Sequence, residues 1–136
     1  MSKVGYIERP LLFDLGQTLD CGQCFRWNRD EGEKDIWRGV AFSKELKIEQ
    51  TQDSLNFYCS EEEFSQVWEN YFDLPRDYGR MKDELAELSP KLKEAIEYAP
   101  GIRILSQDPW EAVCSFIISQ NNNIPRIKGI IDRLCR

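Results

Sequence analysis

The sequence predicts an α+β protein in which an antiparallel sheet comes first and helices follow. Between residues 5 and 60, short stretches of alternating apolar and polar residues are separated by turn-forming residues, which is typical of paired strands. After residue 60, apolar residues recur at helical spacing behind good helix-capping residues. Strands grouped before helices indicate an α+β fold and not the alternating order of a parallel α/β sheet. We place the boundary between sheet and helices near Cys59.

The sheet region contains several stretches with strand character. They cover residues 11–15, 23–27, 36–40, 46–50 and 55–58. Gly16 and Gln17 are expected to turn the chain after the first stretch, and a charged loop at 28–35 follows the second. The last two stretches alternate most regularly, with Gln52 and Asp53 between them. We therefore expect these two to pair as a hairpin.

Three helices are expected between residues 60 and 101. Ser60 is a good N-cap for the first, because its hydroxyl can accept from a free backbone N–H group, and three glutamates follow in the first turn. The buried stripe of this helix is expected to be Phe64, Val67, Trp68 and Tyr71, with Pro75 ending it. The second helix is expected at about 78–88, and the third from Ser89-Pro90 to near Pro100-Gly101.

The stretch from 108 to 136 is expected to form two further helices with a polar break between them. Asp108 is a good N-cap, Pro109 suits the first helical position, and Glu111 completes the pattern of a capping box. The apolar stripe of the first helix is Trp110, Val113, Cys114, Ile117 and Ile118, with Phe116 beside it. Pro125 is expected to start the second helix, whose stripe is Ile124, Ile127, Ile130, Ile131 and Leu134.

The polar break SQNNN (residues 119–123) has two interpretations. Asparagine favours turns and caps and tolerates left-handed backbone conformations, so the break can be a helix–helix turn without further function. It can also offer amide donors and acceptors to a ligand, with Arg126 one turn further on. Amide and guanidinium groups suit the edges of nucleobases, and they would bind sugars or carboxylates nearly as well.

Length and composition indicate one ordinary folded domain. A chain of 136 residues with 41% hydrophobic and 12% aromatic residues can bury a sizeable core. No apolar run approaches the roughly 18 residues of a transmembrane helix. The segment MSKVGYIERP lacks the apolar centre of a secretory signal, so we expect a cytoplasmic location.

The net charge of -6 argues against a simple basic protein that coats DNA. The charge is uneven, however. Residues 100–136 carry five Lys or Arg and three Asp or Glu, a balance of +2, whereas the other 99 residues carry 13 and 21, a balance of −8. An anionic partner is therefore expected to meet the C-terminal part of the chain first.

Five cysteines and no histidine narrow the possible chemistry. Without histidine, the chain cannot build a Ser-His-Asp or Cys-His nucleophile or the usual zinc hydrolase motifs. Cys21 and Cys24 form a C-x-x-C pair, which can be a redox dithiol when it opens a helix. A strand-like segment follows here instead, and no second pair exists to close a zinc site. Two free thiols that lie close together by chance are the better interpretation.

Three motifs taken together are more specific. They read GQCFRW at 22–27, QDPWE at 107–111 and SQNNNIPRI at 119–127. In this order and spacing they resemble the N-terminal part of 8-oxoguanine DNA glycosylases, and the resemblance covers essentially the whole chain. It implies an antiparallel sheet with helices, TATA-binding-protein-like, over residues 1–100. Residues 101–136 would then be the first helices of the all-α, helix-hairpin-helix glycosylase domain.

The resemblance also implies roles for single residues. In the family, the carbonyl of the glycine that matches Gly22 accepts from N7–H of oxidised guanine, where normal guanine has a bare acceptor. A buried hydrogen bond gained, against a clash of two acceptors, is worth about 1–3 kcal/mol. Asn121 and Arg126 match the residues that hold the cytosine left behind by the flipped base. Without the resemblance, Gly22 reads as a bulge glycine and Arg126 as a solvated arginine.

The implied function is base-excision repair: flipping and excision of 8-oxoguanine opposite cytosine in duplex DNA by a glycosylase and AP lyase. The partners would be lesion-containing duplex DNA and the remaining C-terminal half of the same enzyme, with no cofactor, metal or membrane. The family's catalytic lysine and aspartate lie further along, and no lysine here has a matching context. The chain is therefore expected to carry no catalytic residue and to be inactive alone. The alternative is a non-catalytic interaction or DNA-binding module.

Overall fold

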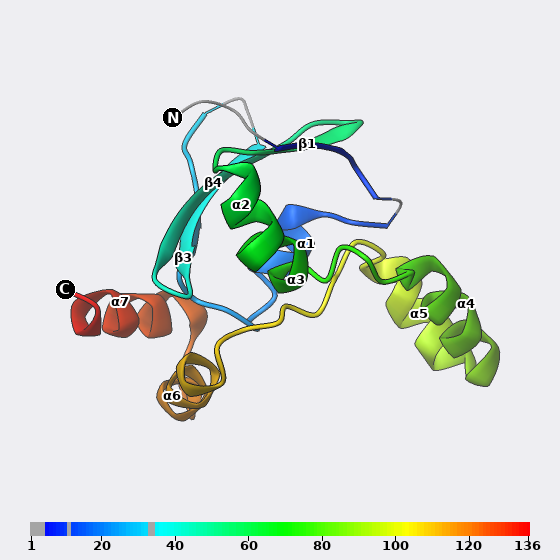
Figure 1. Ribbon diagram of the computed structural model, residues 1–136. Helices are drawn as coiled ribbons and strands as arrows, with labels where there is room; N and C mark the ends of the chain where they lie inside the picture. The colour runs from blue at the N-terminus through cyan, green and yellow to red at the C-terminus, as the bar shows by residue number, and fades with distance from the viewer. Residues whose placement is uncertain (1–4, 11, 33–34) are drawn as a thin grey trace.

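The described residues form one antiparallel sheet packed against helices, which confirms the predicted α+β class (Figure 1). A computed structural model describes residues 5–10, 12–32 and 35–136. Within them the sheet has five strands in the order β1-β5-β4-β3-β2. The strands are β1 (Gly5–Glu8), β2 (Trp27–Arg29), β3 (Asp35–Ala41), β4 (Lys44–Gln50) and β5 (Ser54–Phe57).

The two inner hairpins set the register of the sheet. The predicted hairpin is confirmed, because β4 pairs with β5 antiparallel, with Ile48 opposite Phe57 and Gln50 opposite Leu55. Strand β3 pairs with β4 around a tight turn at Phe42 and Ser43, whose φ angles are 50° and 60°. Two successive positive φ angles match the twist of a two-residue hairpin, although the usual Asn-Gly signal is absent.

Two strand predictions were wrong. Asp14 caps helix α1 (Leu15–Leu19) by accepting from the Gln17 backbone N–H at 2.8 Å, so Gly16 and Gln17 are helical and do not form a turn. Leu11, the first residue of that stretch, lies outside the described residues, as do Glu33 and Lys34 of the charged loop. A short apolar run is compatible with a buried helix as well as with a strand. Here the N-cap at Asp14 favours the helix. In the stretch 23–27, only Trp27 belongs to a strand.

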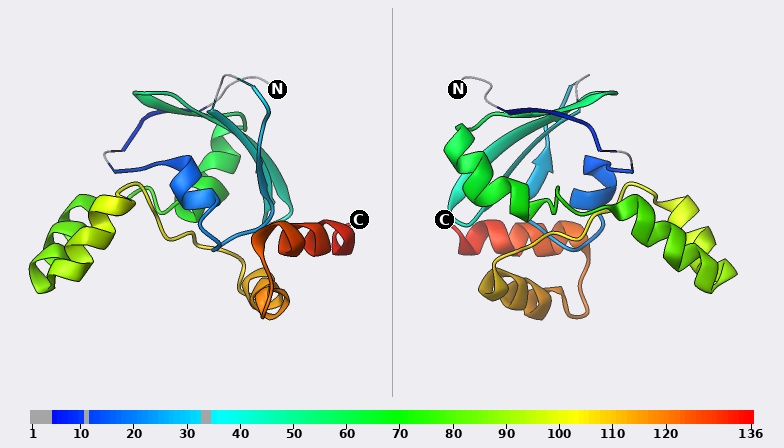
Figure 2. Two further views of the ribbon diagram at one scale, coloured as in Figure 1. Left: turned by 180° about the vertical axis from the view of Figure 1, so that it is seen from behind. Right: turned by 45° about the vertical axis from the view of Figure 1, so that its right-hand side comes forward.

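A helical segment and α1 lie on the same side of the curved sheet (Figures 1 and 2). The segment consists of α2 (Glu61–Glu63), a π-helical turn η1 (Phe64–Trp68) and α3 (Glu69–Tyr71). The predicted cap is confirmed, since the Ser60 hydroxyl accepts from Glu63 N–H at 3.1 Å. The segment ends at Tyr71, four residues before Pro75, because residues 72–75 form turns and Asp73 has a φ of 51°.

The core lies between this segment, α1 and the sheet. Trp27 is 1% exposed, and its indole N–H donates to the Tyr71 hydroxyl at 2.9 Å. Gly39 on the neighbouring strand leaves room for the Trp27 ring, because a Cβ there would lie 2.2 Å from ring atom Cδ2. The largest fully buried side chains are Trp27, Trp68, Phe13, Phe57 and Phe72.

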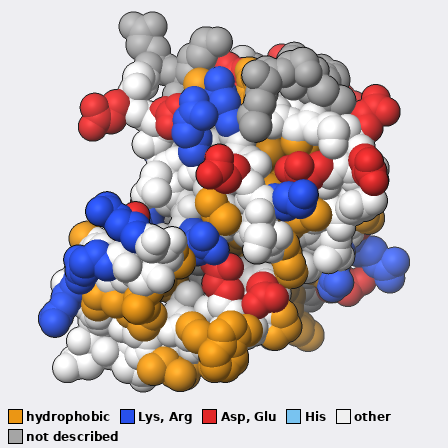
Figure 3. All heavy atoms as spheres, turned by 60° about the vertical axis from the view of Figure 1, so that its left-hand side comes forward, with side chains coloured by type: hydrophobic (Ala, Val, Ile, Leu, Met, Phe, Trp, Pro, Cys, Tyr) orange, Lys and Arg blue, Asp and Glu red, His pale blue; other side chains and the backbone are white. Residues whose placement is uncertain are grey.

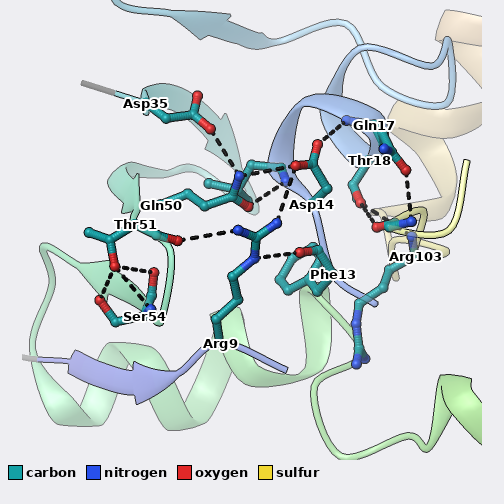
Figure 4. Close-up of polar contacts among 12 residues, drawn as sticks. Arg9, Phe13, Asp14, Gln17, Thr18, Asp35, Gln50, Thr51, Ser54 and Arg103 are labelled. Atoms are coloured by element: carbon teal, nitrogen blue, oxygen red, sulfur yellow. Dashed lines mark hydrogen bonds and ion pairs between the residues drawn. The ribbon is translucent and has the colours of Figure 1, made fainter. Parts of the chain in front are cut away.

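A polar network ties α1 to the sheet and to the segment after residue 100 (Figure 4). The Arg9 guanidinium donates to the Phe13 carbonyl at 2.8 Å and pairs with Asp14 at 3.3 Å. Gln50 donates to Asp14 at 3.1 Å, and Gln17 accepts from Gly101 N–H at 2.7 Å. These contacts join residues near the start of the chain to residues of β4 and to Gly101.

Two helices project from this body as a hairpin (Figures 1 and 2). They are α4 (Tyr78–Leu88) and α5 (Pro90–Tyr98), close to the predicted bounds, and Ser89 caps α5. Arg103 anchors the base of the hairpin: it is 2% exposed, lies against the Tyr78 ring at 4.4 Å and donates to the Asp73 carbonyl at 2.6 Å.

The last two helices are α6 (Pro109–Ser119) and α7 (Ile124–Leu134). In Figures 1 and 2, α7 lies between α6 and the end of the sheet. The predicted stripe of α7 faces inward at Ile127 and Ile131, which are buried. The predicted stripe of α6 is largely exposed instead. Within the described residues, no helix has both the length and the apolar character needed to cross a membrane.

Candidate functional site

The first of the three motifs forms a bend that is held by the segment before α6. The Gln23 side-chain amide donates to the carbonyls of Thr18 at 2.9 Å and Arg103 at 2.7 Å, and its oxygen accepts from Leu105 N–H at 3.0 Å. Gln107 donates to the Gln23 carbonyl at 2.5 Å. The bend at 22–24 is therefore attached to residues about 80 positions away in the sequence.

Gly22 lies at the exposed tip of this bend. Its φ of 88° is a conformation that L side chains rarely adopt, which explains the glycine. A Cβ at this position would lie 3.9 Å from Cδ1 of Ile124, so Gly22 lies next to the start of α7. Within the described part of the chain, the Gly22 carbonyl accepts no hydrogen bond, and it is free to accept one from a ligand.

The first motif also contacts the second and third motifs directly. Arg26 forms an ion pair with Glu111 at 3.4 Å, and each side chain is 26% exposed. Phe25 packs against Ile127 and Ile131 in a small apolar cluster separate from the main core. The three motifs, scattered over a hundred residues, therefore build one region of the surface.

The asparagine triplet divides into two structural residues and one free residue. The Asn122 side chain donates to the Ile118 carbonyl at 3.1 Å and accepts from Asn123 N–H at 3.0 Å. Asn123 is the N-cap of α7 and accepts from Arg126 N–H at 3.1 Å. Asn121 is exposed with a φ of 49°, and its side chain makes no hydrogen bond to the described residues.

The first two turns of α7 carry two cations with different surroundings. Lys128 is tied down, since its ammonium donates to the Trp27 carbonyl at 2.9 Å and reaches Asp20 at 3.4 Å. Arg126 is exposed, and its guanidinium has no partner within residues 5–10, 12–32 and 35–136. Gly22, Asn121 and Arg126 thus flank the α7 start with groups free to bind, and their roles in binding stay predictions.

Sequence reasoning gave the residues that position this site no part in building it. These are Gln23, Gln107, Glu111 and Lys128. The contact of Gln107 with Gln23 and the ion pair of Arg26 with Glu111 join residues of the motifs that carried the resemblance. The sequence signal for Gln23 was its place between a glycine and a buried cysteine. The neighbouring residues do not show which distant groups it bonds to.

The C-x-x-C pair is not arranged as a reactive dithiol. Burial raises the pKa of the Cys24 thiol to about 12, and the neighbouring Cys21 adds to the shift. The Cys24 sulfur lies 3.5 Å from the Leu19 carbonyl. A thiol with a raised pKa is a poor nucleophile, because the thiolate is the reactive form. Among the described residues, no group of three or more His, Cys, Asp or Glu side chains could hold a metal ion.

The chain is similar to known proteins over most of its length. Residues 7–113 match the family model described as 8-oxoguanine DNA glycosylase, N-terminal domain. An N-glycosylase/DNA lyase of Saccharomyces cerevisiae is 31% identical over 140 residues, covering 89% of this chain and 35% of the yeast protein. The chain thus spans about a third of the length of such relatives.

Solved structures extend the similarity over almost the whole chain. The 8-oxoguanine glycosylase/lyase of Clostridium acetobutylicum, in complex with double-stranded DNA containing cytosine opposite 8-oxoguanine, superposes with a TM-score of 0.80 at 43% identity. The match covers 94% of this chain and 46% of that one. MBOgg1 in complex with a low-affinity DNA ligand has a TM-score of 0.81 at 40% identity, covering 92% and 46%.

Proposed function

The chain belongs to the 8-oxoguanine DNA glycosylase family, and on this premise we propose that it binds duplex DNA containing 8-oxoguanine for base-excision repair. Its part would be to recognise the lesion base and the base opposite. The observation that carries the proposal is the set of unpartnered groups at the start of α7: the Gly22 carbonyl, the Asn121 amide and the Arg126 guanidinium. Neighbouring polar groups are occupied by internal contacts.

Gly22 is proposed to discriminate the lesion. Guanine presents a bare acceptor at N7, whereas 8-oxoguanine carries a hydrogen there. A carbonyl that accepts from N7–H of the lesion meets a repulsive acceptor on normal guanine, a difference of about 1–3 kcal/mol. The three hydrogen bonds of Gln23 support this role, because they hold the neighbouring backbone in one place.

Asn121 and Arg126 are proposed to hold the cytosine that remains after the lesion base has left the stack. Cytosine presents two acceptors, O2 and N3, which suit the forked donors of a guanidinium. Asn121 lies in the loop five residues before Arg126. The side chains of Asn122 and Asn123 hold this loop, and their hydrogen bonds use neither the Asn121 amide nor the Arg126 guanidinium. Removing a bidentate base contact costs about 1–3 kcal/mol.

Excision and strand cleavage are proposed for the complete enzyme and not for this chain by itself. One similar protein is named N-glycosylase/DNA lyase. The family resemblance implies that this chemistry uses a lysine that attacks the sugar. None of the chain's eight lysines lies in a context that resembles that residue. We therefore propose that this chain supplies recognition and that the lysine comes from the part of the enzyme outside it.

Binding to three duplexes tests the proposal. Fluorescence anisotropy at several salt concentrations would compare 8-oxoguanine opposite cytosine, 8-oxoguanine opposite adenine, and unmodified guanine opposite cytosine. We expect affinity to fall with salt and to be highest for the lesion opposite cytosine. Salt-independent behaviour, or no binding to any duplex even with the rest of the enzyme, would favour the alternative of an interaction module without DNA chemistry.

Variants make the test specific. Arg126→Ala should cost about 1–3 kcal/mol of binding opposite cytosine and much less opposite adenine. A matched control is Arg80→Ala, since Arg80 is an exposed arginine on α4 whose one ion-pair partner among the described residues is Glu84, at 2.9 Å. An equal loss opposite both bases would make Arg126 a phosphate or packing residue and remove its role in reading cytosine.

A further inference from the structure

Two of the proposed recognition elements lie against each other: the loop of residues 20–27, which we call the Gly22 loop, and the start of α7. Gly22 is next to Ile124, because a Cβ at Gly22 would lie 3.9 Å from Ile124 Cδ1. Phe25 packs against Ile127 in the small apolar cluster. Apolar contacts bring the two elements together, but they are not directional and do not set a defined spacing.

Lys128 adds a directional contact between the Gly22 loop and α7. Its ammonium donates to the Trp27 carbonyl at 2.9 Å and reaches the Asp20 carboxylate at 3.4 Å, so it spans the two ends of the loop. Lys128 follows Ile124 by four residues, which places both on one face of α7. Arg126 is two residues from each, so it does not share that face, and it is exposed. The helix therefore binds the loop with one side and keeps the Arg126 side free.

Within the described residues, Lys128 makes the only hydrogen bonds between the Gly22 loop and α7. The other polar contacts of the loop lead elsewhere. Gln23 bonds to α1 and to the segment before α6, and Arg26 pairs with Glu111 on α6. Because a hydrogen bond has preferred distances and angles, the contact of Lys128 restrains where the loop lies along α7.

A lysine near a DNA-binding surface can also serve as a phosphate contact. The Lys128 side chain is only 23% exposed, however, and a carbonyl and a carboxylate already engage its ammonium. Figure 3 shows Lys and Arg side chains at several separate places on the side of the molecule where α7 and the sheet lie, with acidic side chains between them. Phosphate binding favours a continuous basic stripe instead. The internal contact is therefore the better interpretation of Lys128.

From these contacts we propose that Lys128 is a positioning residue that couples recognition of the lesion to recognition of the base opposite. It does so by fixing the spacing between the Gly22 carbonyl on the loop and the Arg126 guanidinium on α7. The inference rests on the proposed function and adds a dependence of one reading on the other. Such coupling is reciprocal, so cytosine opposite the lesion strengthens the preference for 8-oxoguanine by the factor by which the lesion strengthens the preference for cytosine.

Binding to four duplexes tests the proposal. They carry 8-oxoguanine or guanine, each opposite cytosine or adenine, and fluorescence anisotropy measures their affinity for the full chain. The coupling factor is the preference for the lesion opposite cytosine divided by that opposite adenine. We expect a factor of about fivefold or more for the parent chain. Lys128→Met, which keeps an unbranched side chain but has no donor, should bring the factor close to one. Lys128→Arg, which keeps a cation with donors, should retain most of it.

Lys93→Met is the matched control, since Lys93 is an exposed lysine on α5 that pairs with Glu97 at 4.0 Å. It removes the same charge and should leave the coupling factor unchanged. Asp20→Ala removes the more exposed partner of Lys128 and should lower the factor by a smaller amount. Circular dichroism checks that each variant is folded, and Asp20→Ala decides the test if Lys128→Met is not.

The outcomes separate this inference from the proposed function. A parent chain that prefers the lesion with a coupling factor of one, or a factor that Lys128→Met leaves unchanged or Lys128→Arg fails to retain, would overturn the inference alone. An equal loss on all four duplexes, with a salt slope reduced by about one, would make Lys128 a phosphate contact and would also overturn it. A parent chain without any preference for the lesion would overturn the proposed function, and the inference with it.

Discussion

Replacing Gln23 by alanine tests how the site is built. The half-buried Gln23 amide makes three hydrogen bonds, to Thr18, Arg103 and Leu105, at 2.7–3.0 Å. Each such bond contributes about 0.5–1.5 kcal/mol net, so removing all three should lower the free energy of unfolding by about 1.5–4.5 kcal/mol. The bond from Gln107 ends on the Gln23 backbone and survives the change.

Urea denaturation followed by fluorescence measures this loss, with a constant m-value as the check that only stability has changed. Gln66→Ala is the matched control, because the exposed Gln66 side chain makes one hydrogen bond within the described part of the chain, to Glu62 at 3.0 Å. This change should alter the free energy of unfolding by less than about 0.5 kcal/mol. In the Gln23→Ala variant, the bend at Gly22 loses its three side-chain hydrogen bonds and keeps the one from Gln107. We therefore expect weaker discrimination between 8-oxoguanine and guanine in the anisotropy experiment.

Two results would refute this reasoning. If Gln23→Ala destabilised no more than the Gln66 control, the three bonds would not hold the bend in solution. If Gln23→Ala lowered the free energy of unfolding by the expected amount but left lesion discrimination unchanged, the bend would have a structural role only. The proposed role of Gly22 would then lose its support.

The remaining predictions concern packing, helix propensity, thiol chemistry and activity. Gly39→Ala places a methyl group inside the Trp27 ring and should cost about 1–3 kcal/mol in urea denaturation, the range for overpacking. Gly129→Ala, on α7 with its nearest neighbouring atom 3.6 Å away, should instead stabilise by about 0.5–1 kcal/mol, and a loss would indicate a clash. Because the Cys24 pKa is raised to about 12, its thiolate forms only as the pH rises from 9 towards 12. At pH 8, iodoacetamide should therefore alkylate it about 1,000-fold more slowly than an ordinary cysteine, which peptide mass spectrometry can check. Borohydride trapping on DNA containing 8-oxoguanine should yield no covalent adduct with this chain alone, and any adduct would contradict the proposed absence of a catalytic lysine.

Elements with local signals were predicted well. Ser60 and Asp108 are N-caps in the structure, as the sequence indicated, because a cap bonds to backbone groups two or three residues away. The third helix begins at Ser89-Pro90 as predicted, with Ser89 as its cap. The hairpin of β4 and β5 was also predicted, since alternation and turn residues lie close together in the sequence. The division into domains at residue 100 and the cytoplasmic location stay predictions.

Elements decided by distant contacts were predicted poorly. Residues 23–26 alternate like a strand, yet Gln23 is captured by Thr18, Arg103 and Leu105, and the chain bends instead. Strand β1 carries little periodic signal and exists because it pairs with β5. The exposure of Trp110 and Phe116 could not be read from an apolar pattern either, because the pattern does not say which partner covers it.

The sequence by itself predicted the α+β class, several helix caps and the family. It also named Gly22, Asn121 and Arg126 as candidates for DNA contacts, and these roles stay predictions. These follow from residue types and short spacings, which act through bonds within a few residues. Only the tertiary structure decided that Gly22 lies beside the start of α7 and that Asn122 and Asn123 are used internally while Asn121 stays free. The physical reason is range: the contacts of Gln23, Arg26 and Phe25 join segments about 80–105 residues apart, and such pairing depends on how the whole chain packs.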